Sequence, residues 1–291
     1  IDVADNKTLT YSGAALSLGA YTLTLSGGGT LVSGGLTLND ADSKLLLNSI
    51  TVDNVSTTSD SSSGGLDVDN DSTVSSLSVA HITPVSIASG KTLSGAITVT
   101  AGSIKLDETG TLASTVEMSG GTLDADESLT ISGALTQSGD TTINVLDNKT
   151  LTYTGAPLSL GANTLTMSGG GTFYNSDNLT LSAESILKLD GIEKVEKVYV
   201  SENLTNGFID VDQNATIQTF LHSKSSRIDI ADGKSLTLTD TFEVPADQTM
   251  ELYGSGGGTI NIGDNLTLSG TLKLNATNNT LKNGTLIFNN G

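Results

Sequence analysis

The feature that most constrains this chain is a long internal repeat. Residues 1–31 read IDVADNKTLTYSGAALSLGAYTLTLSGGGTL, and residues 143–173 read INVLDNKTLTYTGAPLSLGANTLTMSGGGTF. The two segments lie 142 positions apart and share 24 of their 31 residues. A third, more diverged copy begins at Ile228 with IDIADGKSLTL. Repetition on this scale indicates structural units stacked along the chain.

A shorter period runs inside each copy. Leu9, Leu16, Leu23 and Leu31 recur every seven or eight residues, each within a run that alternates apolar and hydroxylated side chains. Alternation with a period of two is typical of a β-strand with one buried face. Between the runs stand Ser-Gly, Gly-Gly-Gly and Asp-Asn-Lys, residues that favour tight turns.

Short strands joined by sharp turns favour coils over hairpins, because a meander of such strands would leave long exposed sheet edges. Three strands of about seven residues each close a coil of about 21 residues, within the range of known solenoid repeats. We therefore predict an all-β fold, a right-handed parallel β-solenoid. We expect residues 1–291 to form a single continuous solenoid, duplicated as residues 1–142 and 143–227 with a third diverged copy over residues 228–291. The leucines expected in its apolar column are Leu9, Leu16, Leu23, Leu151, Leu158, Leu165 and Leu236.

One segment carries a helix-like spacing. Ile192, Val195 and Val198 recur at three-residue intervals, but Val-Tyr-Val follows and the surroundings are rich in strand patterns. We expect an edge strand or a short excursion there rather than a helix.

Composition agrees with a narrow core. Aromatic residues make up 4% of the chain, charged residues 15%, and Trp is absent. A wide interior at native packing density needs large side chains, whereas an interior one or two Leu or Val side chains across does not.

Charge excludes several partners. The 13 basic and 32 acidic residues give a net charge of −19, which repels phosphate backbones, so nucleic acid is not an expected partner. The chain has no Cys and no run of 18 apolar residues, so we expect neither disulfides nor a transmembrane segment. It opens at Ile1 without an apolar leader, as expected of a processed form or a segment of a longer protein.

The phrases LSLGANTLTMSGGGT and DNKTLTYTG resemble the strand repeats of autotransporter passengers and filamentous-haemagglutinin-type adhesins. That resemblance implies a right-handed parallel β-helix, a secreted or cell-surface location, and a role in adhesion or in surface coats.

Catalytic residues are scarce. His81 and His222 are the two histidines and Arg227 is the one arginine. The closest approach to a catalytic cluster is the segment from His222 to Asp229, which we interpret as an exposed polar loop because no Trp and few Tyr accompany it. Glycan-cleaving β-helix enzymes need clustered carboxylates with a basic residue, and aromatic side chains against which sugar rings lie, so we expect no enzyme here.

Acidic residues offer one candidate metal site. Asp67, Asp69 and Asp71 alternate in GGLDVDNDS, and alternate residues of a strand share a face, so their carboxylates could bind calcium. Solvated, outward-facing carboxylates are the alternative. No other cofactor is expected.

These observations predict an extracellular structural protein, a subunit of a self-assembling filament, sheath or surface coat. Its expected partners are copies of itself, stacked end to end, because the first ten residues match an interior segment. The alternative is an adhesin whose loops, at Ser56–Gly65 or His222–Arg227, bind a receptor or a surface glycan. A tailspike-like glycan depolymerase comes third.

Overall fold

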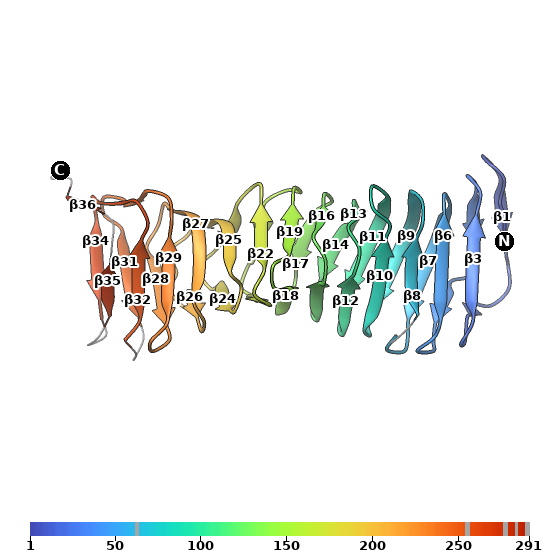
Figure 1. The fold of residues 1–291 in the computed structure, drawn as a ribbon, viewed down its shortest axis with the longest axis horizontal. Helices are drawn as coiled ribbons and strands as arrows, with labels where there is room; N and C mark the ends of the chain where they lie inside the picture. The colour runs from blue at the N-terminus through green and yellow to red at the C-terminus, as the bar shows by residue number, and fades with distance from the viewer. Residues whose placement is uncertain (62–63, 254–256, 276–278, 283–284, 289–291) are drawn as a thin grey trace. The chain divides into compact units, whose positions relative to one another are not determined.

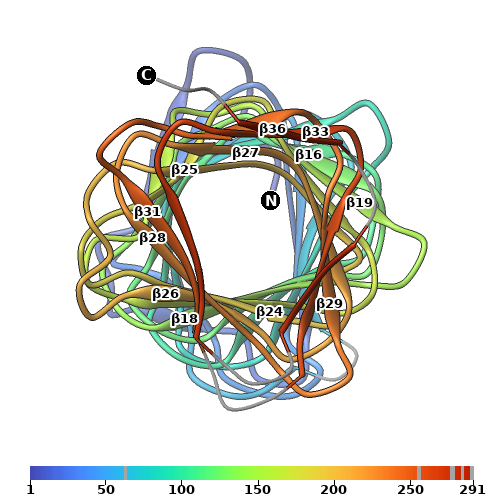
Figure 2. The same ribbon diagram turned by 90° about the vertical axis from the view of Figure 1, so that its left-hand side faces the viewer.

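The computed structural model describes residues 1–61, 64–253, 257–275, 279–282 and 285–288. Within these residues the chain is all-β, without helix, and its strands form turns of a right-handed parallel β-solenoid, about 12 turns in all with roughly 22 residues per turn (Figures 1 and 2). The predicted fold class is therefore confirmed. The chain divides into two compact units, Ile1–Thr136 with Leu151–Ala156, and Gln137–Thr150 with Pro157–Gly291. Continuity of one solenoid through both units stays a prediction.

The first unit is built from β1 (Thr8–Thr10), β2 (Leu16–Ser17), β3 (Thr22–Ser26), β4 (Thr30–Val32), β5 (Leu36–Leu38), β6 (Lys44–Asn48), β7 (Thr51–Thr57), β8 (Gly65–Val68), β9 (Ser72–Val79), β10 (Thr83–Ile87), β11 (Thr92–Val99), β12 (Ser103–Leu106), β13 (Thr111–Leu112), β14 (Thr115–Met118), β15 (Thr122–Ala125), β16 (Leu129–Ile131), β17 (Leu135–Gln137) and β19 (Thr150–Tyr153).

The second unit is built from β18 (Thr141–Val145), β20 (Leu158–Ser159), β21 (Thr164–Ser168), β22 (Thr172–Asn175), β23 (Leu179–Leu181), β24 (Ile186–Asp190), β25 (Lys194–Val200), β26 (Phe208–Val211), β27 (Ala215–His222), β28 (Ser226–Ile230), β29 (Ser235–Leu238), β30 (Phe242–Val244), β31 (Thr249–Tyr253), β32 (Thr259–Ile262), β33 (Asn265–Leu268), β34 (Thr271–Leu274), β35 (Thr280–Lys282) and β36 (Thr285–Phe288).

Each coil has three sides, and strands pair in parallel with their counterparts one coil later, with one interruption described below. In the first unit, β1 pairs with β4, β2 with β5 and β3 with β6. Where a coil has a single long strand, as in β7, that strand covers two sides and pairs with both β4 and β5. Figure 2 shows β27, β28 and β29 on three different sides of a coil in the second unit.

The interior of each unit is a stack of alternate strand residues. In the second unit Leu165 of β21 pairs with Leu187 of β24, and both side chains are buried. In the first unit Leu47 of β6 pairs in the same way with Val68 of β8. Burying a side chain of this size contributes about 1.5–3 kcal/mol, so each coil is stabilised by the coils that cover it.

Left-handed turn positions recur in the duplicated copies. Asn6 and Asn148 occupy the same place in the two segments, with φ angles of 58° and 61°. Gly19 and Gly161 do so as well, with φ angles of 56° and 57°. Asn and Gly reach this region at low cost, which is the reason that the turn residues repeat along with the leucines.

The predicted apolar column is correct in one copy and wrong in the other. Leu151, Leu158, Leu165 and Leu236 are buried, whereas Leu9 and Leu16 are exposed and Leu23 is half-buried. The physical reason lies in the pairing of the first coil. Among the described strands, β1 and β2 each have a paired neighbour on one side and none on the other. β3 is covered on its second side by residues 1–3, which hydrogen-bond to it near Ser26.

The segment with helix-like spacing is strand β25, as favoured by its sequence, but it is not at an edge. β25 pairs with β22 and β23 on one side and with β27 on the other. Val195 and Val198 both point inward because the strand turns a corner between them, where Glu196 and Lys197 intervene.

Candidate functional site

A groove in the second unit lies where the parallel pairing between coils is interrupted. β25 and β27 are long strands that each cover two sides of a coil, and they pair with each other from Lys194 beside Thr216 to Val200 beside His222. One coil later, β29 continues the ladder from β27, but β30 pairs only with β33 among the described strands. The last backbone hydrogen bonds before the break run from Thr239 N–H to the Ile217 carbonyl, at 3.2 Å, and from Asp240 N–H to the Gln218 carbonyl, at 3.0 Å.

The interruption has a cause in the chain itself. In β27 two residues separate the inward-facing Ile217 and Phe220. In the next coil three residues, Thr239-Asp240-Thr241, separate the equivalent inward positions, Leu238 and Phe242. The corner is thus one residue longer, and beyond it the two strands fall out of register.

The first unit contains the same mismatch and absorbs it. Two residues separate Val74 and Leu77 in β9, and three separate Leu93 and Ile97 in β11. There the pairing shifts at Gly95 and then resumes with Ile97 beside Leu77. Gly95 has a φ angle of 124°, a conformation that favours glycine. The corner at 239–241 has no glycine, so the extra residue opens the ladder instead.

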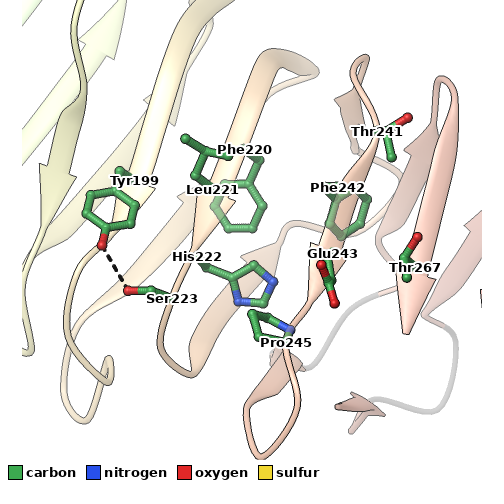
Figure 3. A pocket seen from close by; sticks show the side chains of 10 residues that line it. All are labelled: Tyr199, Phe220, Leu221, His222, Ser223, Thr241, Phe242, Glu243, Pro245 and Thr267. Carbon is green, nitrogen blue, oxygen red and sulfur yellow. Dashed lines mark hydrogen bonds between the residues drawn. The ribbon is translucent and has the colours of Figure 1, made fainter. Parts of the chain in front are cut away.

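The groove at this break has a volume of about 560 Å³. It is lined by Tyr199, Phe220, Leu221, His222, Ser223, Thr241, Phe242, Glu243, Pro245 and Thr267 (Figure 3). Apolar and aromatic side chains make up half of this lining. Leu221 and Glu243 are exposed, whereas Phe220, His222 and Phe242 are buried at its base.

His222 forms the polar part of that base. Its ring stacks on Phe220 with 5.4 Å between centroids, and Phe220 in turn meets Phe242 edge-on at 6.2 Å. Nδ1 lies 3.1 Å from the Lys224 carbonyl oxygen, which can only accept, so Nδ1 carries the proton. Nε2 is buried and has no hydrogen-bond partner among the described residues. Figure 3 shows the ring pointing across the break toward Glu243 and Pro245.

Burial lowers the pKa of His222, and the Lys224 and Glu243 backbones oppose that shift more weakly. The ring is therefore neutral at pH 7 and presents Nε2 as an acceptor. Glu243 adds a carboxylate, and no Lys or Arg lines the groove. Tyr199 is held in place by its hydroxyl, which lies 2.9 Å from Ser223 Oγ. The polar groups at this site thus favour a ligand that donates hydrogen bonds.

The predicted exposed loop from His222 to Asp229 is corrected by this geometry. His222 ends β27 and is buried, while Ser226, Arg227 and Asp229 belong to β28. Only the turn between the two strands is the polar connection that the sequence suggested. Arg227 faces away from the groove, over the ring of Tyr253 at 4.3 Å from its centroid.

The three candidate calcium ligands do not share one strand, and Asp67 and Asp71 have different partners. Asp67 is on β8 and pairs with Lys44 at 2.9 Å. Asp69 and Asp71 follow the end of β8, so the strand geometry that would align all three does not extend to them. Asp71 accepts a hydrogen bond from Thr92 N–H at 2.9 Å. No group of three or more acidic, His or Cys residues placed to hold a metal ion occurs in the described part of the chain.

The other candidate loop, Ser56–Gly65, includes residues 62 and 63, which lie outside the described residues. Ser56 belongs to β7 and Gly65 to β8. Ser61, between them, is buried, and its hydroxyl donates to the Ala41 carbonyl at 3.1 Å.

The groove residues other than His222 gave no signal in the sequence. Phe220, Phe242 and Glu243 belong to ordinary strand patterns, and only the unequal corner lengths, counted from one coil to the next, could have indicated the break. Comparisons with protein-family models, with curated proteins and with solved structures found no match. The β-solenoid of repeated short strands is consistent with the repeat pattern of β-helix surface proteins. The described residues contain no helix able to span a membrane.

Proposed function

We propose that this chain is an extracellular structural protein whose coils stack on copies of itself to build a filament, sheath or surface coat. The observation that carries the proposal is that one coil pattern recurs along the chain and that successive coils pair in parallel, so a coil can pair with a copy as it pairs with its own neighbour. In the first copy the side chains of Leu9, Tyr11 and Leu16 are 42%, 47% and 36% exposed.

The duplicated segment supports the inference that a further coil covers these side chains. Leu151, Tyr153 and Leu158 occupy the same places in the second copy and are 0%, 1% and 3% exposed. The same sequence pattern is therefore able to lie beneath another coil. Such a covering coil removes both apolar surface and unpaired strand edges from water.

A self-stacking contact of this kind is heterologous, because one end of a coil stack meets the opposite end of another. Such contacts do not close and so generate filaments. The resemblance to autotransporter passengers and filamentous adhesins supports a surface location. The net charge of −19 argues against nucleic acid as a partner.

Light scattering and electron microscopy of the purified chain test this proposal. We expect concentration-dependent assemblies that lengthen along one axis. Leu9→Lys should suppress them, because a charged side chain would then be buried at the contact. Ile82→Lys is the matched control, since Ile82 is equally exposed but lies away from the first coil. A parent chain that stays monomeric at high concentration, with its first coil ordered, contradicts the proposal.

The adhesin alternative draws support from the groove beside His222. The depolymerase alternative draws none, because Glu243 is the one carboxylate among the residues that line this groove, and glycan hydrolysis uses two. We propose no catalytic role.

A further inference from the structure

The residues that line the groove between β27 and β30 are of the kinds found in small-molecule sites. This groove indicates a binding role in addition to self-assembly. Its volume of about 560 Å³ falls within the range of about 300–1,000 Å³ that is usual for such sites. Sites of this kind combine an apolar lining with a few placed polar groups. Here Tyr199, Leu221 and Pro245 supply the apolar surface, and Glu243 and His222 supply the polar groups.

An inserted peptide strand does not fit this break. Cα atoms of β27 and β30 lie within 8 Å of each other. Two strands that flank a third are about 9.5 Å apart, twice the usual spacing between neighbours. The groove therefore suits a ligand that enters from the side, not one that completes the ladder.

The polar groups restrict the ligand further. His222 Nε2 is a buried acceptor with no hydrogen-bond partner in the described part of the chain, and leaving such a group unsatisfied is costly. The Glu243 carboxylate accepts a hydrogen bond from Ser269 Oγ at 2.7 Å and has capacity to accept more. Among the described residues that line the groove there is no Lys or Arg to form an ion pair with an anionic ligand. The ligand must donate hydrogen bonds, carry no negative charge and present an apolar face.

A neutral sugar meets these conditions, because its hydroxyls donate from the edge of a ring whose C–H faces are apolar. We propose that the groove between β27 and β30 binds a neutral sugar residue of a glycan, with Tyr199 and Leu221 against the ring and with Glu243 and His222 accepting hydrogen bonds from its hydroxyls.

Two variants address the two parts of this proposal. Glu243→Ala removes an exposed carboxylate, together with the surface hydrogen bond that it accepts from Ser269, and leaves the buried side chains in place. Asp240→Gly removes the hydrogen bond that Asp240 accepts from Thr219 at 2.6 Å. It also places a glycine where Gly95 absorbs the same insertion in the first unit, and it should let β30 pair with β27 and close the groove. Glu193→Ala is the control, because Glu193 is exposed on the same unit but does not line the groove.

The probes are cellotriose, maltotriose and the N-acetylglucosamine trimer, with a galacturonic acid trimer as the anionic counterpart, titrated into the purified chain by calorimetry. We expect saturable binding of at least one neutral trisaccharide and none of the anionic one. Glu243→Ala should weaken binding about tenfold, the effect of one charge-assisted hydrogen bond. Asp240→Gly should abolish it while raising the melting temperature, and Glu193→Ala should leave it unchanged.

Three results would overturn the proposal. The first is no binding of any neutral trisaccharide. The second is equal binding by the parent chain and by Glu243→Ala. The third is a preference for the anionic trimer or for an organic amine such as choline. Should Asp240→Gly fail to fold, shown by loss of the parent's cooperative melting, the exposed Glu243→Ala variant still decides the question.

Discussion

Gly95 of β11 pairs with Val74 of β9 at the point where the register between these two strands shifts. A Cβ atom on Gly95 would lie 1.7 Å from the carbonyl oxygen of Val74, and the φ angle of Gly95 is 124°. Both the space and the conformation therefore require glycine where β11 accommodates its extra corner residue against β9.

Gly95→Ala should accordingly lower the free energy of unfolding by more than about 2 kcal/mol, from the strained backbone together with the displaced ladder. Gly90→Ala serves as the control. Gly90 also has a positive φ, 71°, but a Cβ atom added there would meet no atom within 4 Å, so this variant measures backbone strain alone. Urea denaturation compares the two, and equal losses would show that the contact with Val74 is unimportant.

Leu165→Asp tests the apolar column of the second unit. Leu165 is buried between β18 and β24, so an aspartate there would place an unpaired carboxylate in a narrow, dry interior. We expect a loss of more than about 3 kcal/mol, spreading to the neighbouring coils. Leu23→Asp changes the equivalent residue of the first copy, which is half-buried, and should cost clearly less. Thermal melting followed by circular dichroism checks both, and a parent-like melt of Leu165→Asp would contradict the register described above.

An acidic cluster on β26 and β28 predicts a pH effect. Asp210 lies in register with Asp229, and partial burial together with nearby Asp212 raises the pKa of both carboxyls. A raised pKa means that the folded state binds these protons more tightly than the unfolded state. The cluster therefore destabilises the fold at neutral pH, and this penalty disappears as the pH falls below the pKa of an ordinary aspartate.

Asp210→Asn should raise the stability at pH 7 by less than about 1 kcal/mol, because solvent screens a carboxylate that is half exposed. The gain should vanish at pH 3, where Asp210 is protonated in the parent as well. Melting curves of parent and variant at both pH values provide the measurement, with Glu193→Gln as an exposed control outside the cluster. A gain of the same size at both pH values would show that charge is not its origin.

The acidic composition also predicts that calcium stabilises the fold. With a net charge of −19, bound cations relieve self-repulsion, and a site at Asp67, Asp69 and Asp71 would add a specific effect. We expect calcium to raise the melting temperature above that found in chelator. Monovalent salt at matched ionic strength separates screening from binding, and identical melting in the two salts would remove the specific site. Asp69→Asn is the variant of choice, because Asp67 pairs with Lys44 and Asp71 with Thr92 in the fold.

The alternation of apolar and hydroxylated residues, with Asn and Gly at the turns, was sufficient to predict a parallel β-solenoid of short strands. This succeeded because both signals are local. A period of two places one face of a strand inward, and positions such as Asn6 and Asn148 need a left-handed backbone wherever the segment lies. The coil length followed from the same spacing, close to the roughly 22 residues observed.

Burial and the groove were decided by tertiary structure, because both depend on what the adjacent coil contributes. Leu9 and Leu151 stand in nearly identical segments, yet one is exposed and the other buried, since side-chain burial in a solenoid requires coils on both sides. The break beside His222 arises from a single extra residue at 239–241, and its effect appears only when that corner is set against the shorter one in β27. The register between two coils depends on the lengths of both of their corners. These corners are separated in the sequence by a whole coil, so no local sequence pattern reveals a difference between them.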